Sequence, residues 1–155
     1  MATIQEVKKL LGDGKILEAL KLSDQVEDRE AMADELSHIA GCLEYSTSQH
    51  YPIAGMLLQQ AMLLDPKNPY IFYNMGLHHT EDGPLAEDSD SVKKAVRAYK
   101  KALRLKPDFH EARYNLALLY YFTGEYDKAK VEYQRVLESC PNDLRFLEVR
   151  LLFDK

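Results

Sequence analysis

The stretch YNLALLYYFTGEYDKAKVEYQRVLESCPND, residues 114–143, holds the clearest copy of a pattern that recurs along this chain. In its second half, Ala129, Tyr133 and Val136 are spaced by four and then three residues, and Pro141 follows five residues later. Residues at spacings of four and three lie on one face of an α-helix. Proline ends such a segment, because it lacks an N–H donor and biases the residue before it away from helical geometry. The stretch therefore predicts a helix with one apolar face that stops near Pro141.

The same spacing occurs in two earlier segments, as Ala54, Leu58, Ala61 and Pro66, and as Ala95, Tyr99, Ala102 and Pro107. A second apolar segment precedes each of these three helices: HIAGCLEY at 38–45, FYNMGLHH at 72–79 and RYNLALLY at 113–120. Each has a small residue near its centre, and small residues allow two helices to pack closely. We therefore expect Cys42, which shares this column with Gly76 and Ala117, to be a small buried side chain. The chain is a tandem array of helix pairs.

These residues resemble the tetratricopeptide repeat family, whose unit of about 34 residues pairs an aromatic–Leu–Gly–Tyr helix with an Ala–Phe–Pro helix. The resemblance implies an all-α fold of tandem helix-turn-helix repeats, a right-handed α-solenoid. It is closest over 110–143. The sequence departs from the family at His38 and Arg113, where a large aromatic residue is usual, and at His79 in the tyrosine column.

We assign residues 1–155 to a single domain with three clear repeats, at 35–68, 69–109 and 110–143. Residues 1–34 resemble a degenerate first repeat that caps the amino-terminal end, with a Gly12–Asp13–Gly14 turn between two helical pieces. Residues 144–155 have a helical pattern that is apolar on almost every side. The closing helix of a solenoid normally turns a polar face to water, so this one is a candidate oligomer contact through Leu144, Leu147, Leu151 and Phe153.

The middle repeat is seven residues too long, and the extra residues fall near 84–90, within the acidic stretch EDGPLAEDSDS at 81–91. A calcium loop of the EF-hand type is excluded, because Val92 and Lys93 stand where ligands are required. The stretch is predicted to be a solvated loop whose acidic end favours the start of the next helix, or else a contact site. That helix carries a basic side, which is either a solvated face or a site for an acidic partner: Lys93, Arg97, Lys100, Lys101 and Arg104.

The composition is that of an ordinary globular protein, with 46% hydrophobic and 29% charged residues. Its net charge of −5 divides into −10 over residues 1–90 and +5 over 91–155. The overall acidity argues against non-specific binding of nucleic acid, whereas the asymmetry favours a polarised partner or a second copy of the chain. No apolar run is long enough for a signal peptide or a membrane span, so we expect a cytoplasmic protein without membrane insertion.

No constellation of residues indicates catalysis. The five histidines include no pair at the spacing of a helical metal site, and the two cysteines imply neither a disulfide framework nor a metal quartet. The sequence has no glycine-rich phosphate loop and no nucleophile elbow. We therefore expect a protein that is not an enzyme and binds no cofactor or metal.

The family resemblance implies that the first helix of each repeat, here about 36–47, 70–81 and 111–122, lines a concave groove that holds a peptide or a partner protein. Carried over by column, the groove residues are Leu36, Ile39, Ala40, Leu43 and Ser46 in one repeat, Tyr70, Tyr73, Asn74, Leu77 and Thr80 in the next, and Glu111, Tyr114, Asn115, Leu118 and Tyr121 in the last. We favour as partner-binding residues Tyr70, Tyr73, Asn74, Leu77, Glu111, Tyr114, Asn115, Leu118 and Tyr121. The leucines among them could equally pack within the array.

Chaperone adaptors of this family grip a terminal carboxylate with five polar residues, and only the position of Asn74 matches here. Ile39 and Leu43 stand in two of the other columns, and Glu111 and Asn115 in the last two. The expected ligand is therefore an extended or helical segment with apolar groups rather than an acidic terminus. The leading hypothesis is a non-enzymatic adaptor that binds a protein or peptide in its groove, and the alternative is a self-assembling structural protein.

Overall fold

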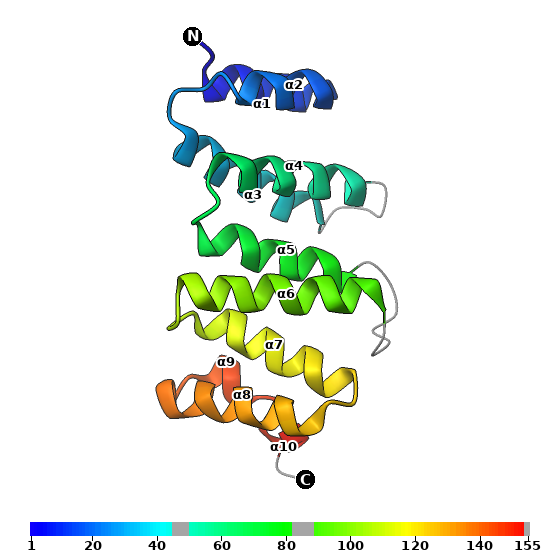
Figure 1. Ribbon diagram of the computed structural model, residues 1–155, viewed down its shortest axis with the longest axis vertical. Helices are drawn as coiled ribbons and strands as arrows, with labels where there is room; N and C mark the ends of the chain where they lie inside the picture. Colours follow the sequence, from blue (N-terminus) through cyan, green and yellow to red (C-terminus); the bar gives the residue numbers. More distant parts are fainter. Residues whose placement is uncertain (45–49, 82–88, 154–155) are drawn as a thin grey trace. The chain divides into compact units, whose positions relative to one another are not determined.

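The computed structural model describes residues 1–44, 50–81 and 89–153. This part of the chain forms helices and no strand, with one isolated bridge between Ala2 and Val26. The all-α prediction is thus confirmed (Figure 1). The helices are α1 (Ile4–Gly12), α2 (Ile16–Ser23), α3 (Arg29–Glu44), α4 (Tyr51–Leu64), α5 (Pro69–Glu81), α6 (Asp90–Leu105), α7 (His110–Phe122), α8 (Tyr126–Ser139), α9 (Leu144–Leu147) and α10 (Arg150–Phe153). None of these described helices is both long enough and apolar enough to cross a membrane.

The chain divides into two compact units, Met1–Asn74 and Met75–Lys155, and the boundary falls inside α5. In the first unit, α1 packs on α2 and α3 packs on α4, and α2 also contacts α4. In the second unit, α6 contacts α7, α7 packs along α8, and the two short helices α9 and α10 contact α8 (Figure 1). Neighbours in sequence are therefore neighbours in space, as expected of helix pairs.

The apolar faces predicted for the second helix of each pair are confirmed. On α4, the side chains of Ala54, Leu58 and Ala61 are at most 1% exposed. The equivalent residues on α6 and α8 are also buried, namely Ala95, Tyr99, Ala102, Ala129, Tyr133 and Val136. All three helices end just before the proline that follows them, at Leu64, Leu105 and Ser139. The repeated spacing thus defines both the buried face and the end of each helix.

The turns of two helix pairs share one geometry. Gly14, between α1 and α2, and Gly124, between α7 and α8, have positive φ angles of 75° and 85°. Each turn is closed by the same two backbone hydrogen bonds. Gly124 N donates to Tyr121 O at 3.1 Å and the next amide to Tyr120 O at 2.8 Å, and the first turn repeats this arrangement. This likeness supports the interpretation of the amino-terminal segment as a helix pair of the same kind.

The seven-residue acidic insertion near 84–90 lies almost wholly outside the described residues, and only its end can be placed. Ser89 caps α6, since its hydroxyl oxygen accepts a hydrogen bond from Val92 N at 3.1 Å. Asp90 pairs with Lys94 at 2.7 Å, and the hydrogen bond from this lysine lowers the pKa of the aspartate. The polar end of the insertion therefore stabilises the start of α6.

Two expectations about α3 are wrong. The helix begins at Arg29 rather than near 36, because the Asp28 carboxylate accepts a hydrogen bond from Ala31 N at 3.0 Å. The boundary placed between 34 and 35 therefore falls within α3. Cys42 is exposed rather than buried, because it lies two residues beyond the fully buried Ala40 and so about 200° around the helix from it.

The C-terminal segment differs from the single helix expected at 144–155. It forms two helices of one turn each, α9 and α10. Leu144 and Leu151 are 75% and 77% exposed, but Phe153 is only 7% exposed, so its assignment as an oligomer contact is wrong for this conformation. Its ring packs inside the second unit.

Candidate protein-binding surfaces

In the first unit, three of the predicted partner-binding residues lie on the start of α5. Tyr70 is 51% exposed, and Tyr73 and Asn74 are half-buried. Asn74 is oriented by α3, since its Nδ2 donates a hydrogen bond to Ser37 Oγ at 2.8 Å. The amide is therefore partly committed to the fold before any ligand arrives.

Of the α3 residues predicted to line the groove, some are buried and others are accessible. Leu36 and Ala40 are fully buried, so their assignment to an open groove is wrong. Ile39 and Leu43 are half-buried and line a pocket of about 470 Å³. The pocket is lined by Lys8, Leu11, Gly12, Gly14, Ile16, Ile39, Leu43, His50, Ile53 and Leu57. Its wall is mainly aliphatic, which suits an apolar side chain.

The charged group at this pocket is already paired. Lys8 Nζ lies 2.6 Å from Glu35 Oε1, in an ion pair between α1 and α3. The sequence did not single out Lys8, Leu11, Ile16 or Ile53, because the groove positions were assigned only on the first helices of the three clear repeats. These four residues come from the degenerate pair α1 and α2 and from α4. Only the packing of the helices brings them beside Ile39.

In the second unit, five predicted residues follow one another along a single face of α7. Glu111, Tyr114, Asn115, Leu118 and Tyr121 are all half-buried. Leu77, on the last part of α5, is half-buried as well. Spacings of three and four residues make the α7 positions neighbours along the helix. We call this row of five side chains the α7 face.

The α7 face is covered in part by the chain's own C-terminal segment, residues 143–153, which we call the tail. Phe146 lies 5.1 Å from the Tyr114 ring, centroid to centroid, and Phe153 lies 5.4 Å from the Tyr121 ring. Phe153 also stacks on Tyr133 of α8 at 4.1 Å. Tyr133 Oη donates a hydrogen bond of 2.5 Å to Phe146 O. The tail therefore docks through two phenylalanines seven residues apart.

Charged groups add to this docking. Arg145 Nη1 lies 3.1 Å from Glu111 Oε1 on the α7 face, and Arg145 Nη2 lies 2.6 Å from Asp143 Oδ2 in the tail itself. The hydrogen bonds with Arg145 lower the pKa of Asp143, and Asp143 in turn raises the pKa of the guanidinium. Burial, with a smaller effect from Glu148, raises the pKa of Tyr114 above its ordinary value of 10.0. These pKa shifts keep Asp143 and Arg145 charged and Tyr114 neutral at neutral pH.

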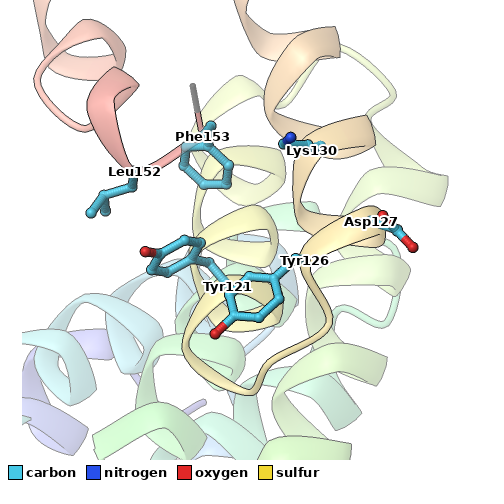
Figure 2. Close-up of a pocket in the computed structure, with 6 residues that line it drawn as sticks. All are labelled: Tyr121, Tyr126, Asp127, Lys130, Leu152 and Phe153. Atoms are coloured by element: carbon cyan, nitrogen blue, oxygen red, sulfur yellow. The ribbon is translucent and has the colours of Figure 1, made fainter. Parts of the chain in front are cut away.

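The tail does not fill the space around Phe153. A pocket of about 340 Å³ is lined by Tyr121, Tyr126, Asp127, Lys130, Leu152 and Phe153 (Figure 2). A second pocket, of about 460 Å³, shares Lys130 and Phe153 with the first. Figure 2 shows the rings of Tyr121, Tyr126 and Phe153 gathered together with Leu152 beside them. Tyr126 is 57% exposed, so the edge of this aromatic cluster faces solvent.

Arg113, which departs from the aromatic residue usual in its column, is used to join two helices. Its Nη1 lies 2.7 Å from Glu132 Oε2 on α8, and its Nη2 donates to Pro107 O at 3.0 Å. Both charged side chains are 17% exposed. An ion pair thus takes the place of ring packing between α7 and α8.

Among the described residues, no group of three or more His, Cys, Asp or Glu side chains could hold a metal ion. His38 Nε2 and Cys42 Sγ lie 3.8 Å apart on the exposed side of α3.

Comparisons with known proteins agree with the architecture. Residues 88–150 match the profile of a family described as tetratricopeptide repeat. Among the similar solved structures are two that each match 96% of this chain. They are MamA protein, with a TM-score of 0.65 and 20% identity over 77% of its chain, and a thermophilic TPR protein of Thermus thermophilus, with 0.64 and 24% over 76%. At these identities the likeness shows the fold alone.

The chain spans half or less of the length of the curated relatives named below. The chain is 27% identical to human protein O-mannosyl-transferase TMTC1 over 82% of its own length and 15% of the relative's. It is 32% identical to photosystem I assembly protein Ycf3 of Synechococcus sp. WH7803 over 57% of its length and 50% of the relative's. It is 27% identical to Hsp70-Hsp90 organizing protein 2 of Arabidopsis thaliana over 68% of its length and 17% of the relative's.

Proposed function

We propose that this chain, whose residues 88–150 match the tetratricopeptide repeat family, is a protein-binding scaffold rather than an enzyme. Two of the relatives bear names that speak of assembling or organizing other proteins. The transferase is the exception, and the chain corresponds to only 15% of its length. The sequence has no nucleophile elbow, no metal-ligand spacing and no glycine-rich phosphate loop.

The pocket of the first unit carries this proposal. Ile39 and Leu43 come from the helix that the family uses for ligands, and they line an aliphatic space of about 470 Å³ with Leu11 and Ile53. Two or three apolar side chains of a partner would fill a space of this size. The ligand we propose is an extended or helical segment that places aliphatic groups in this pocket and lies along Tyr70 and Tyr73.

The test is affinity capture from native lysate followed by titration of the purified partner. Ile39→Ala removes three methyl or methylene carbons from the pocket wall, and we expect it to weaken partner binding by about tenfold. Leu17→Ala is the matched control, because Leu17 is an aliphatic residue of the same unit that is 67% exposed and lies outside the pocket. It should leave the affinity unchanged.

Tyr73→Ala extends the test to α5, and Leu17→Ala serves again as the control. Each variant is first checked for unchanged helix content and unfolding temperature. A partner that binds the Ile39 and Tyr73 variants as tightly as the wild type would refute the location in the first unit. Turnover of a substrate by the purified chain would refute the scaffold assignment itself.

Self-assembly is the second candidate, and the exposed leucines of the tail favour it. The Leu144 and Leu151 side chains are 75% and 77% exposed. Exposure of two large apolar side chains to water is unfavourable, and association with a second chain would bury them. We expect light scattering to show a concentration-dependent oligomer that Leu144→Glu/Leu151→Glu dissolves. A wild-type chain that stays monomeric at every concentration and at low salt would rule this function out.

A further inference from the structure

The tail lies on the α7 face, where the repeat pattern places a partner. Three of the five residues of this face have a partner in the tail: Glu111 pairs with Arg145, Tyr114 with Phe146, and Tyr121 with Phe153. The contacts are of two kinds, an ion pair at Glu111 and aromatic packing at Tyr114 and Tyr121. The chain's own segment thus displays the chemistry that fits this face.

The tail is a poor occupant in three respects. Its helices, α9 and α10, are four residues each, and helices this short are unstable without tertiary contacts. It leaves Leu144 and Leu151 in solvent while only Phe146 and Phe153 are buried. Pockets of about 340 and 460 Å³ remain on the two sides of Phe153. A segment that formed one continuous helix and filled these spaces would bury more surface on the same face.

We propose that the α7 face, with the adjoining side of α8, binds a helical segment of a partner protein in place of the tail. The segment carries a basic residue followed directly by an aromatic residue, and a second aromatic residue seven positions further on. Residues 143–153 occupy the surface when no partner is bound. This inference rests on the proposed function, in which the first helices of the repeats bind partner segments.

The pattern follows from the side chains that are present. The Glu111 carboxylate accepts a cation opposite it, as its ion pair with Arg145 shows. Tyr114, Tyr121 and Tyr133 offer ring surfaces, to which a second aromatic ring adds edge or offset contacts. Two residues seven apart lie on one side of a continuous helix, two turns from each other. One helix can therefore reach both aromatic positions.

The probe is a fluorescent synthetic peptide with the sequence of residues 142–153, NDLRFLEVRLLF. It is titrated into the full-length wild type and into Phe146→Ala/Phe153→Ala, whose own tail lacks both rings. We expect the variant to bind the peptide at least about tenfold more tightly, since in the wild type only molecules with an undocked tail can bind. A control peptide with alanine at the two phenylalanine positions should not bind.

A charge exchange tests the register of the segment. Glu111→Lys, added to the tail-released variant, should weaken the peptide several-fold, and a peptide with Arg145→Glu should recover the loss. Because Phe146 and Phe153 are buried, helix content is compared first. Arg145→Glu in the full chain is a milder second route to tail release, since this residue is 65% exposed and leaves the rings in place.

Equal affinity for wild type and both released variants would overturn the inference, as would peptide binding that survives loss of both phenylalanines. A wild-type dimer that Phe146→Ala/Phe153→Ala abolishes would assign the surface to a second copy instead, which also overturns it. If the peptide does not bind but Ile39→Ala still weakens partner binding, only this inference is refuted and the proposed function stands. If Ile39 and Tyr73 prove irrelevant while the peptide binds as expected, the failure belongs to the proposed site in the first unit.

Discussion

Replacing Gly76 by alanine tests the close packing of α5 against α6 in the second unit. A Cβ atom at this position would lie 2.5 Å from Tyr99 Cε1 and 2.7 Å from both Cδ1 and Cζ. These distances are far below van der Waals contact. Tyr99 is only 1% exposed, so its ring has no open space to move into. The substitution therefore forces either the ring or the helix to shift.

Two opposing effects set the magnitude. Alanine is a better helix former than glycine by about 1 kcal/mol. Overpacking a closely packed site costs about 1–3 kcal/mol, and contact with a buried ring falls toward the upper end of that range. The clash therefore wins, and we expect Gly76→Ala to lower the free energy of unfolding by roughly 1–2 kcal/mol. For a chain of this size that corresponds to a fall in Tm of about 2–8 °C.

Gly41→Ala is the matched control, because Gly41 is also helical, in α3, but nothing lies within 4 Å of an added Cβ. Here only the helix-forming effect remains, and we expect a gain of about 0.5–1 kcal/mol. The assay is urea unfolding followed by far-UV circular dichroism, with the m value checked for constancy. The reasoning is refuted if Gly76→Ala is as stable as the wild type, or if both variants shift in the same direction.

Three further predictions concern local features. Gly124→Ala should lower stability by about 1–2 kcal/mol, because residue 124 has a φ of 85°; unfolding at the wild-type urea midpoint would contradict this. Thr3→Val should return the pKa of Glu6 toward its ordinary 4.5, because the hydrogen bond from the Thr3 side chain lowers that pKa. In the wild type, the stability that the Glu6 carboxylate contributes is present above pH 4.5 and is lost as the pH falls through the lowered pKa. An unchanged Glu6 titration by NMR would disprove the capping role. Tyr114 should titrate above pH 10.0 by NMR, because burial raises its pKa. Because the neutral ring is the form that burial favours, docking of the tail on Tyr114 should weaken as the pH rises through this raised pKa. If Phe146→Ala/Phe153→Ala leaves the pKa of Tyr114 unchanged, the tail does not cause the shift.

The second helices could be predicted in detail because their signals are local. Ala95, Tyr99 and Ala102 repeat the spacing of four and three, and one helical face then has no alternative to burial. Proline ended each of these helices for a reason internal to the backbone. The start of α3 was missed because Asp28 acts as a cap without any repeat signal around it. Cys42 was misplaced for a different reason: it was aligned with Gly76 and Ala117, but in α3 the buried position is Ala40.

Only part of each candidate site could be predicted from the sequence. The alignment of the first helices correctly predicted that Glu111, Tyr114 and Tyr121 lie on one face of α7. It did not indicate that Phe146 and Phe153 would cover this face, although their spacing of seven residues was a usable signal. In the first unit, Ile39 was assigned to the groove, but the α1, α2 and α4 residues that complete its pocket share no column with it.

The sequence by itself determined the class of fold, the helix pairs and the buried face of each second helix, because these depend on spacings within about a dozen residues and on the backbone chemistry of proline and glycine. Only the tertiary structure decided which helix faces remain accessible. Leu36 and Ile39 are equally apolar and three residues apart, yet one is fully buried and the other lines a pocket. Accessibility depends on which segment packs against a side chain, and for the α7 face that segment is the tail, which returns from the end of the chain to cover it.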